Sequence, residues 1–175
     1  PILAQTMRHP SYLPVVLAAL LLAGCDEPPH PTVSLYRAVQ VGDLEQIRRH
    51  IVWKTDLNQA DPQGAFPLHV AARTGQVNIA RDLAEHGASL VTLDAAGRTP
   101  LALALLHGKT QVAAMLLDKG APLDAQATLV ALVQAGVSDR DSVEFLIRHG
   151  ADLNRPDPEG RRPLHLAVSL GHLES

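Results

Sequence analysis

This chain of 175 residues has a single cysteine, few aromatic residues and no excess of positive charge. Each of these features excludes a class of protein. A single Cys rules out an intramolecular disulfide framework and any zinc site built from several cysteines. Only 3% of the residues are aromatic, and 15 Lys and Arg stand against 18 Asp and Glu, without a long basic run. Nucleic-acid binding is therefore not expected, because it needs clustered cations or stacked aromatic rings. The length suits one ordinary domain.

The lone cysteine closes an N-terminal segment that has the layout of an export signal. Arg8 and His9 follow Met7, where we expect translation to start, and an apolar run occupies residues 12–22. A run of about eleven residues is too short to cross a bilayer of roughly 30 Å as a helix. We therefore expect residues 1–24 to be upstream residues and a signal peptide, outside the fold.

The letters LAGC at residues 22–25 resemble the lipobox of bacterial lipoprotein precursors. The resemblance implies that Cys25 is acylated, with palmitate among its chains, and becomes the mature N-terminus of a lipoprotein. It further implies a membrane anchor in the bacterial cell envelope, facing the periplasm, in either the inner or the outer membrane. The alternative is a small-residue segment with a chance Cys. Residues 25–32 would be the lipidated Cys and a Pro-rich tether, with a reach of roughly 20 Å.

Glycine and proline reveal an internal repeat. A spacing of 33 residues joins Gly42, Gly75 and Gly108; Gly64 and Gly97; Pro67 and Pro100; and Gly87 and Gly120. Within one period, turn residues at 61–64 precede Pro67, which suits the first turn of a helix, and Gly75 can end that helix. The pattern predicts a second helix from about Gln76 to His86, with Gly87 as a left-handed cap.

Apolar residues recur at helical spacing in each predicted second helix. The stripe comprises Leu44, Ile47 and Ile51; Val77, Ala80, Leu83 and Ala84; Val112, Met115 and Leu116; and Val143, Leu146 and Ile147. One helix pair is too small to bury its own apolar face, so the pairs must stack. The sequence therefore predicts a solenoid whose stability is a sum over repeats and interfaces.

The residues of this period resemble ankyrin repeats. The family's TPLHxA motif is matched by FPLHVA at 66–71, TPLALA at 99–104 and RPLHLA at 162–167, and its Gly-Ala-Asp-x-Asn motif by GADLN at 150–154. The resemblance implies an all-α solenoid of stacked helix-turn-helix units with short hairpin turns. It places the repeats at about 33–60, 61–93, 94–126 and 127–156, with an incomplete fifth at 157–175.

Three departures from the family pattern carry structural expectations. Lys54 takes the place of a capping Gly, at an expected cost of up to about 1 kcal/mol if its backbone is left-handed. No repeat keeps both the Thr and the His of TPLH, so the Thr-His hydrogen bond cannot form within one motif. The fourth repeat lacks five residues before Ala127 and gains two around residues 137–141. It should therefore have no projecting hairpin and a longer loop between its helices.

The histidines and aspartates that could suggest a metal site or a catalytic site are better explained by their structural roles in the repeat. His69 and His165 share one repeat position and His86 and His149 another, so periodicity explains them, and neighbouring repeats lie too far apart to share a zinc ion. Asp61, Asp94 and Asp157 each precede a turn glycine by three, where an Asp side chain binds local backbone amides. The sequence has no G-x-S-x-G, Walker loop or H-E-x-x-H motif. We expect no enzyme, no cofactor and no small-molecule substrate.

The remaining candidate is a protein-binding surface. In ankyrin-like folds the hairpin tips and the exposed side of the first helices bind partners, which here selects Gln63, Arg73, Thr74, Arg98, Leu106, His107, Gln134, Glu159, Arg161 and Leu170. Our hypothesis is an acidic protein partner docked on this basic concave face, with Leu106 and Leu170 as apolar anchors. The alternative is a set of solvated arginines in turns.

The sequence thus predicts a membrane-anchored envelope protein that binds an unidentified protein without chemistry of its own. One alternative is that the repeats are the targeting portion of a longer enzyme or toxin. A second is a secreted effector, which the lipobox disfavours because an acylated protein stays with its membrane.

Overall fold

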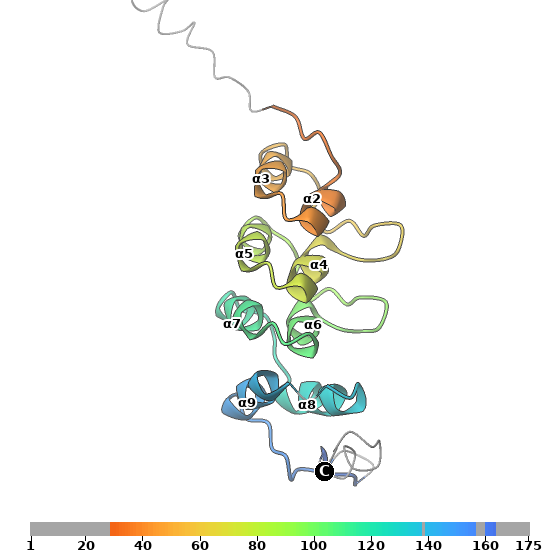
Figure 1. Cartoon of the computed structure of the whole chain (residues 1–175), viewed down its shortest axis with the longest axis vertical. Helices are drawn as coiled ribbons and strands as arrows, with labels where there is room; N and C mark the ends of the chain where they lie inside the picture. Colours follow the sequence, from red (N-terminus) through yellow and green to blue (C-terminus); the bar gives the residue numbers. More distant parts are fainter. Residues whose placement is uncertain (1–28, 138, 157–159, 164–175) are drawn as a thin grey trace, which may run out of the picture.

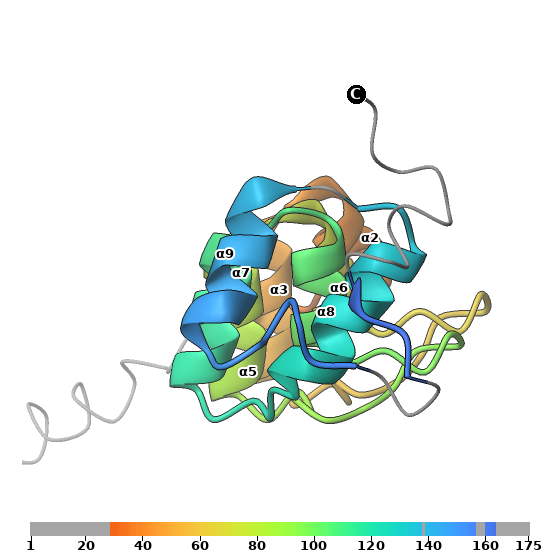
Figure 2. The ribbon, with the colours of Figure 1, turned by 90° about the horizontal axis from the view of Figure 1, so that it is seen from below.

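The structure is a computed structural model that describes residues 29–137, 139–156 and 160–163. In this part of the chain, helices are stacked in pairs. Figure 1 shows the pairs one below another, and Figure 2 shows them along the stack. They are α2 (Leu35–Val41) with α3 (Leu44–Val52), α4 (Pro67–Thr74) with α5 (Val77–Glu85), α6 (Pro100–Leu106) with α7 (Thr110–Asp118), and α8 (Ala125–Gln134) with α9 (Arg140–Arg148). This confirms the predicted all-α solenoid. None of these helices is long and apolar enough to cross a membrane.

The ends of the helices follow from local chemistry. Pro67 and Pro100 occupy the first helical positions of α4 and α6, where the missing N–H costs no hydrogen bond. Gly75 ends α4 with φ +79°, a left-handed conformation that glycine adopts without a steric penalty. The predicted second helix at 76–86 is confirmed as α5, with Gln76 and His86 as its flanking residues.

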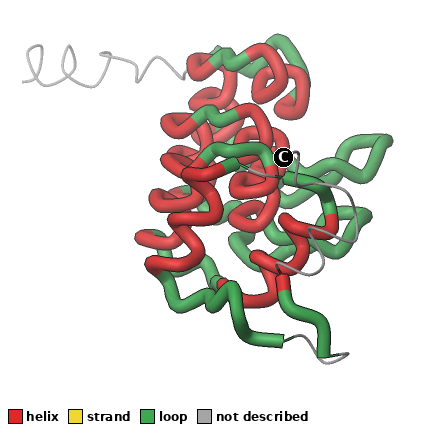
Figure 3. The backbone as a smooth tube through the Cα atoms, turned by 60° about the horizontal axis from the view of Figure 1, so that its bottom comes forward, coloured by secondary structure: helices red, strands yellow, loops and turns green. Residues whose placement is uncertain are grey.

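Two parallel rows of helices enclose the core, as Figure 3 shows. The first helices of the pairs form one row and the second helices the other, with Leu and Ala buried between them. In the second helices, Ile47, Leu83, Leu116 and Leu146 are completely buried, which confirms the central positions of the predicted stripe. Ile147 is a wrong assignment, because 43% of it is exposed.

The fourth repeat differs from the others as the sequence predicts. Two hairpins project beside α4 and α6 in Figure 1, whereas the connection from α7 to α8 runs directly over residues 119–124. α8 ends at Gln134 and α9 begins at Arg140, so five residues separate them, against the two that separate α4 from α5. Ser142 joins this repeat to the third, because its buried Oγ donates a 2.8 Å hydrogen bond to the carbonyl of Leu105.

The segment that precedes α2 lies against the first repeat. The His30 ring stacks on Trp53 with centroids 3.6 Å apart, and the Thr32 amide donates to Gln46 Oε1 at 2.9 Å. The carbonyl of Val33 accepts a 2.8 Å hydrogen bond from His50 Nε2. Residues 30–33, which include the end of the predicted tether, are therefore held on the fold.

Lys54 has the left-handed backbone that its position in the repeat predicts. Its φ is +51°, and no other residue except glycine has a positive φ in the described part of the chain. The amide of Lys54 donates to the carbonyl of Ile51 and that of Thr55 to His50, the hydrogen-bond pattern of a Schellman helix end. This pattern fixes the strained conformation of Lys54.

Replacing Lys54 with glycine should raise the free energy of unfolding by about 0.5–1 kcal/mol, because glycine adopts this conformation without the Cβ penalty. The side chain is exposed, so little packing is lost. Urea denaturation followed by circular dichroism measures the change. Lys54→Ala is the control, because it removes the same side chain and keeps the Cβ. A gain of equal size in both variants would show that the backbone is not the cause.

Candidate protein-binding site

The two projecting hairpins are built around Asp61 and Asp94. Asp61 Oδ1 accepts hydrogen bonds from the amides of Gln63 and Ala65, at 3.0 and 2.6 Å. Asp94 Oδ1 accepts from the equivalent amides in the second hairpin, each at 2.9 Å. The interpretation of these carboxylates as turn residues is confirmed, and Asp157 lies outside the described residues. These hydrogen bonds fix the shape of each hairpin tip.

A buried histidine connects the second repeat to the next hairpin. His69 is 3% exposed, and its Nε2 donates to the carbonyl of Arg98 at 3.0 Å. Its Nδ1 has no hydrogen-bond partner among the described residues, because Phe66 takes the place of the motif's Thr. Burial lowers the pKa of His69 and outweighs the carbonyl of Arg98, which acts in the opposite direction. His69 therefore acts as a neutral connection between repeats.

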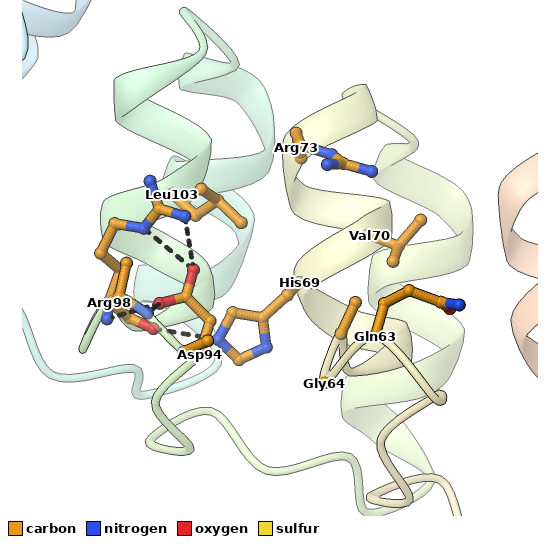
Figure 4. Close-up of a pocket in the computed structure, with 11 residues that line it drawn as sticks. Gln63, Gly64, His69, Val70, Arg73, Asp94, Arg98 and Leu103 are labelled. Atoms are coloured by element: carbon orange, nitrogen blue, oxygen red, sulfur yellow. Dashed lines mark hydrogen bonds and ion pairs between the residues drawn. The ribbon is translucent and has the colours of Figure 1, made fainter.

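A cleft of about 330 Å³ lies between the two hairpins. Figure 4 shows Gln63 on the first hairpin, Arg73 on α4 and Arg98 on the second hairpin around it. These three residues belong to the predicted binding surface, and the structure brings them to one cavity. His69 and Val70 of α4, together with Leu103 of α6, form the rest of the wall.

The two arginines of this cleft differ in their freedom to bind a partner. Arg98 pairs with Asp94 in its own hairpin, with Nε and Nη2 at 2.9 and 2.7 Å from Oδ2. Burial raises the pKa of Asp94, but hydrogen bonds from Arg98 and the hairpin amides outweigh it and lower that pKa. Arg73 is exposed and makes no hydrogen bond or ion pair with the described residues. Arg73 is therefore the available cation of the cleft.

The positive potential of the neighbouring cations reaches His107 at the end of α6 and disfavours its charged form. Partial burial lowers its pKa, and the charges of Arg73, Arg98 and Lys109 lower it further. Thr74, also predicted to bind, instead donates its hydroxyl to the carbonyl of Val70 at 2.8 Å within α4. The concave face over the second and third repeats is therefore basic.

The other predicted residues lie beyond this cleft. Leu106 is partly buried against the core, Gln134 is exposed at the end of α8, and Arg161 is exposed in the short segment 160–163. Glu159, Leu170 and Cys25 lie outside the described residues. The structure therefore places Leu106 and Gln134 one and two repeats from Arg73, in equivalent positions.

A second cleft was missed by the sequence interpretation. It has a volume of about 390 Å³ between α6 and α8 and is mainly apolar, and we call it the α6–α8 notch. Its apolar walls include Leu101, Ala102, Leu106, Leu123, Ala127 and Ala131. The five-residue deletion before Ala127 is the signal that could have found it, because the missing hairpin leaves this place uncovered.

Charges on the second helices are mostly paired with one another. Arg48 Nε lies 3.4 Å from Asp82 Oδ2, and Lys119 Nζ lies 2.6 Å from Glu85 Oε1, each pair joining neighbouring repeats. His86 and His149 place Nδ1 2.7 Å from the carbonyl four residues earlier, as equivalent repeat positions should. The described residues contain no group of three His, Cys, Asp or Glu that could hold a metal ion.

Comparison with known proteins identifies the repeats. A family profile described as ankyrin repeats, three copies, matches residues 35–128. The chain is 32% identical over 122 residues to the neurogenic locus notch homolog protein 1 of Xenopus laevis, covering 67% of this chain and 5% of that protein. It is 29% identical over 142 residues to the transient receptor potential cation channel subfamily A member 1 homolog of Caenorhabditis elegans, covering 79% and 12%.

The E3 ubiquitin-protein ligase KEG of Arabidopsis thaliana is 30% identical over 152 residues, which cover 78% of this chain and 9% of the ligase. The chain thus spans from 5% to 12% of the length of these three relatives. The likeness coincides with the stacked helix pairs and their hairpins. The chain therefore belongs to the ankyrin-repeat family.

Proposed function

We propose that this chain is a lipid-anchored protein of the bacterial envelope that binds another protein through the concave face of its ankyrin repeats. Ankyrin repeats are protein-interaction modules, and the proposal adds the surface, the partner's charge and the location. The role is static recognition by a rigid scaffold, without catalysis. The observation that carries it is the exposed Arg73, which has no ion-pair partner among the described residues, beside the cleft of about 330 Å³.

The distribution of charge favours the concave face over the opposite one. Asp82 and Glu85 on α5 are neutralised by Arg48 and Lys119 of the adjacent repeats, so the outer row has satisfied much of its charge internally. Arg73 lies on the other row and has no such partner among the described residues. An acidic group of a partner would supply the missing counter-charge and gain from the focused positive potential.

The anchor in this proposal is Cys25, on the strength of the leader and the LAGC sequence. Because residues 30–33 are held on the first repeat, only residues 26–29 separate Cys25 from the fold. Four extended residues reach about 14 Å at most. The first repeat would therefore stand close to the membrane, with the basic face one repeat away.

Crosslinking of the full, lipidated chain in its bacterial envelope, followed by capture and mass spectrometry, tests the binding surface. We expect a defined crosslinked protein that is lost or at least about tenfold reduced with Arg73→Glu. Arg81→Glu on exposed α5 is the matched control, because it makes the same change of charge on the outer row. Equal recovery with both variants would show that the concave face is not the binding surface.

The anchor is tested separately by palmitate labelling and by sensitivity of processing to globomycin. Cys25→Ser should abolish labelling and release the protein from the membrane fraction. Absence of labelling in the unaltered chain would refute the lipoprotein assignment and favour the secreted effector.

A second candidate function is that these repeats target a longer enzyme or toxin. The similarity to a ubiquitin-protein ligase, of which the repeats cover only 9%, favours it. The coding sequence after Ser175 distinguishes the two: further repeats support the binding protein, and a change of composition into a new domain supports the targeting portion.

A further inference from the structure

The α6–α8 notch results from two linked departures in the repeat pattern. At the second repeat, His69 binds the carbonyl of Arg98 in the following hairpin. At the third repeat, Ala102 takes the position of His69, and the hairpin that would follow is missing. The small side chain and the absent hairpin together leave a cavity of about 390 Å³ in place of a covered contact.

The floor of the notch is apolar and partly formed by exposed side chains. Ala127 and Ala131 on α8 are exposed, while Leu106 and Leu123 are only partly buried. Thr128 is satisfied within α8, because its hydroxyl donates to the carbonyl of Asp124 at 2.7 Å. Such a surface gains stability by burying a large apolar side chain.

The concave face carries a negative charge beside the notch and a positive charge at Arg73. Asp124 borders the notch, where its carboxylate caps α8 by accepting from the amide of Ala127 at 2.9 Å. An acidic ligand group is therefore disfavoured there and favoured at Arg73, on α4. Arg98 borders both clefts, which makes them adjoining parts of one surface.

The distance between the two positions fixes the length of a matching ligand. Arg73 and Leu106 occupy the same position in successive repeats, and packed helix axes lie about 8–10 Å apart. The step from Arg73 to the notch, one to one and a half helix spacings, is about 8–15 Å. An extended chain covers this with three residues in the polyproline II conformation, at about 3.1 Å each, or with four residues in a β-strand, at about 3.3 Å each. Both spacings place the two side chains on the same face of the segment.

We propose that the concave face recognises an extended segment of the partner protein that carries an acidic residue three or four positions from a large apolar residue. The acidic side chain pairs with Arg73, and the apolar side chain fills the α6–α8 notch. This inference rests on the proposed function and specifies its ligand.

Selection from a random twelve-residue displayed peptide library on the full chain tests the proposal. Enriched peptides should carry Asp or Glu three or four positions from Leu, Ile, Met or Phe. The affinity of the best synthetic peptide, measured by fluorescence anisotropy, should fall at least about tenfold with Arg73→Glu and with Ala131→Glu. The second variant places a carboxylate in the apolar notch at an exposed helical position.

Arg81→Glu and Gln111→Glu, both exposed on the outer row, are the controls and should leave the peptide affinity unchanged. Thermal unfolding of each variant checks that the fold is retained. The proposal is overturned if no peptide is enriched, if the enriched peptides lack this spacing, or if Ala131→Glu has no effect on their binding.

Capture of the envelope partner by the two variants distinguishes a failure of this proposal from a failure of the proposed function. If its capture requires Arg73 but is unaffected by Ala131→Glu, the concave face stands and the notch has no role. If neither variant reduces capture, the proposed binding surface itself is wrong.

Discussion

Leu146→Ala should lower the free energy of unfolding by about 2–5 kcal/mol, whereas Ile147→Ala should lower it by about 1 kcal/mol or less. The two residues are neighbours in α9, and the sequence places both in the apolar stripe. Leu146 is completely buried in the core, and its truncation leaves a cavity between the helix rows. Ile147 is already 43% exposed in the native state, so its truncation removes less buried apolar surface and leaves no enclosed cavity.

Urea denaturation followed by circular dichroism measures both variants. Repeat proteins can unfold in steps, so the earlier of two transitions should shift with Leu146→Ala if the fourth repeat unfolds separately. Similar losses for the two variants would contradict the prediction and mean that Ile147 is covered in the folded protein in solution.

The different fates of Leu146 and Ile147 show what a repeat pattern predicts and what it does not. Consecutive residues of a helix point about 100° apart, so only one of two neighbours can face the centre of the core. Glycine and proline spacing predicted the helix pairs, their order and the left-handed backbone of Lys54, because each depends on local chemistry. The orientation of α9 depends on packing against α7 and α8, which one sequence does not specify.

The sequence predicted only those features of the candidate site that follow from the repeat positions. Repeat positions correctly placed Gln63, Arg73 and Arg98 around one face, which a periodic fold requires. The pairing of Arg98 with Asp94 was missed, although the hairpin brings these residues within 2.7 Å. The notch was missed as well, because the deletion in the fourth repeat predicts a lost hairpin but does not by itself show which side chains of α6 and α8 that hairpin would have covered.

Hydrogen bonds from a side chain to a distant backbone carbonyl were the least predictable feature. Ser142 Oγ reaches the carbonyl of Leu105 across 37 positions of sequence, and neither residue belongs to a motif. The same holds for His50, which joins the segment before α2 to the end of α3. Such hydrogen bonds leave no periodic pattern in the sequence, yet they attach the segment before α2 to the first repeat and the fourth repeat to the third.

His50→Ala should lower the free energy of unfolding by about 2–4 kcal/mol, since it removes a buried ring and leaves polar groups without partners. His50 is only 7% exposed. Its Nε2 donates to the carbonyl of Val33 at 2.8 Å, and its Nδ1 accepts from the Thr55 hydroxyl at 3.0 Å. Without the ring, the segment before α2 loses its attachment, and hydrogen exchange at the amide of Thr32 should accelerate.

His86→Ala is the matched control for this loss. His86 is exposed, and its ring contacts a carbonyl of its own helix, so the cost should stay within about 0.5 kcal/mol. Urea denaturation compares the two variants, and hydrogen exchange shows whether residues 30–33 are released. If His50→Ala destabilised the chain without faster exchange at Thr32, the ring would stabilise the first repeat alone. Release of the whole segment, including the stack of His30 on Trp53, would instead lengthen the link between the proposed anchor at Cys25 and the fold.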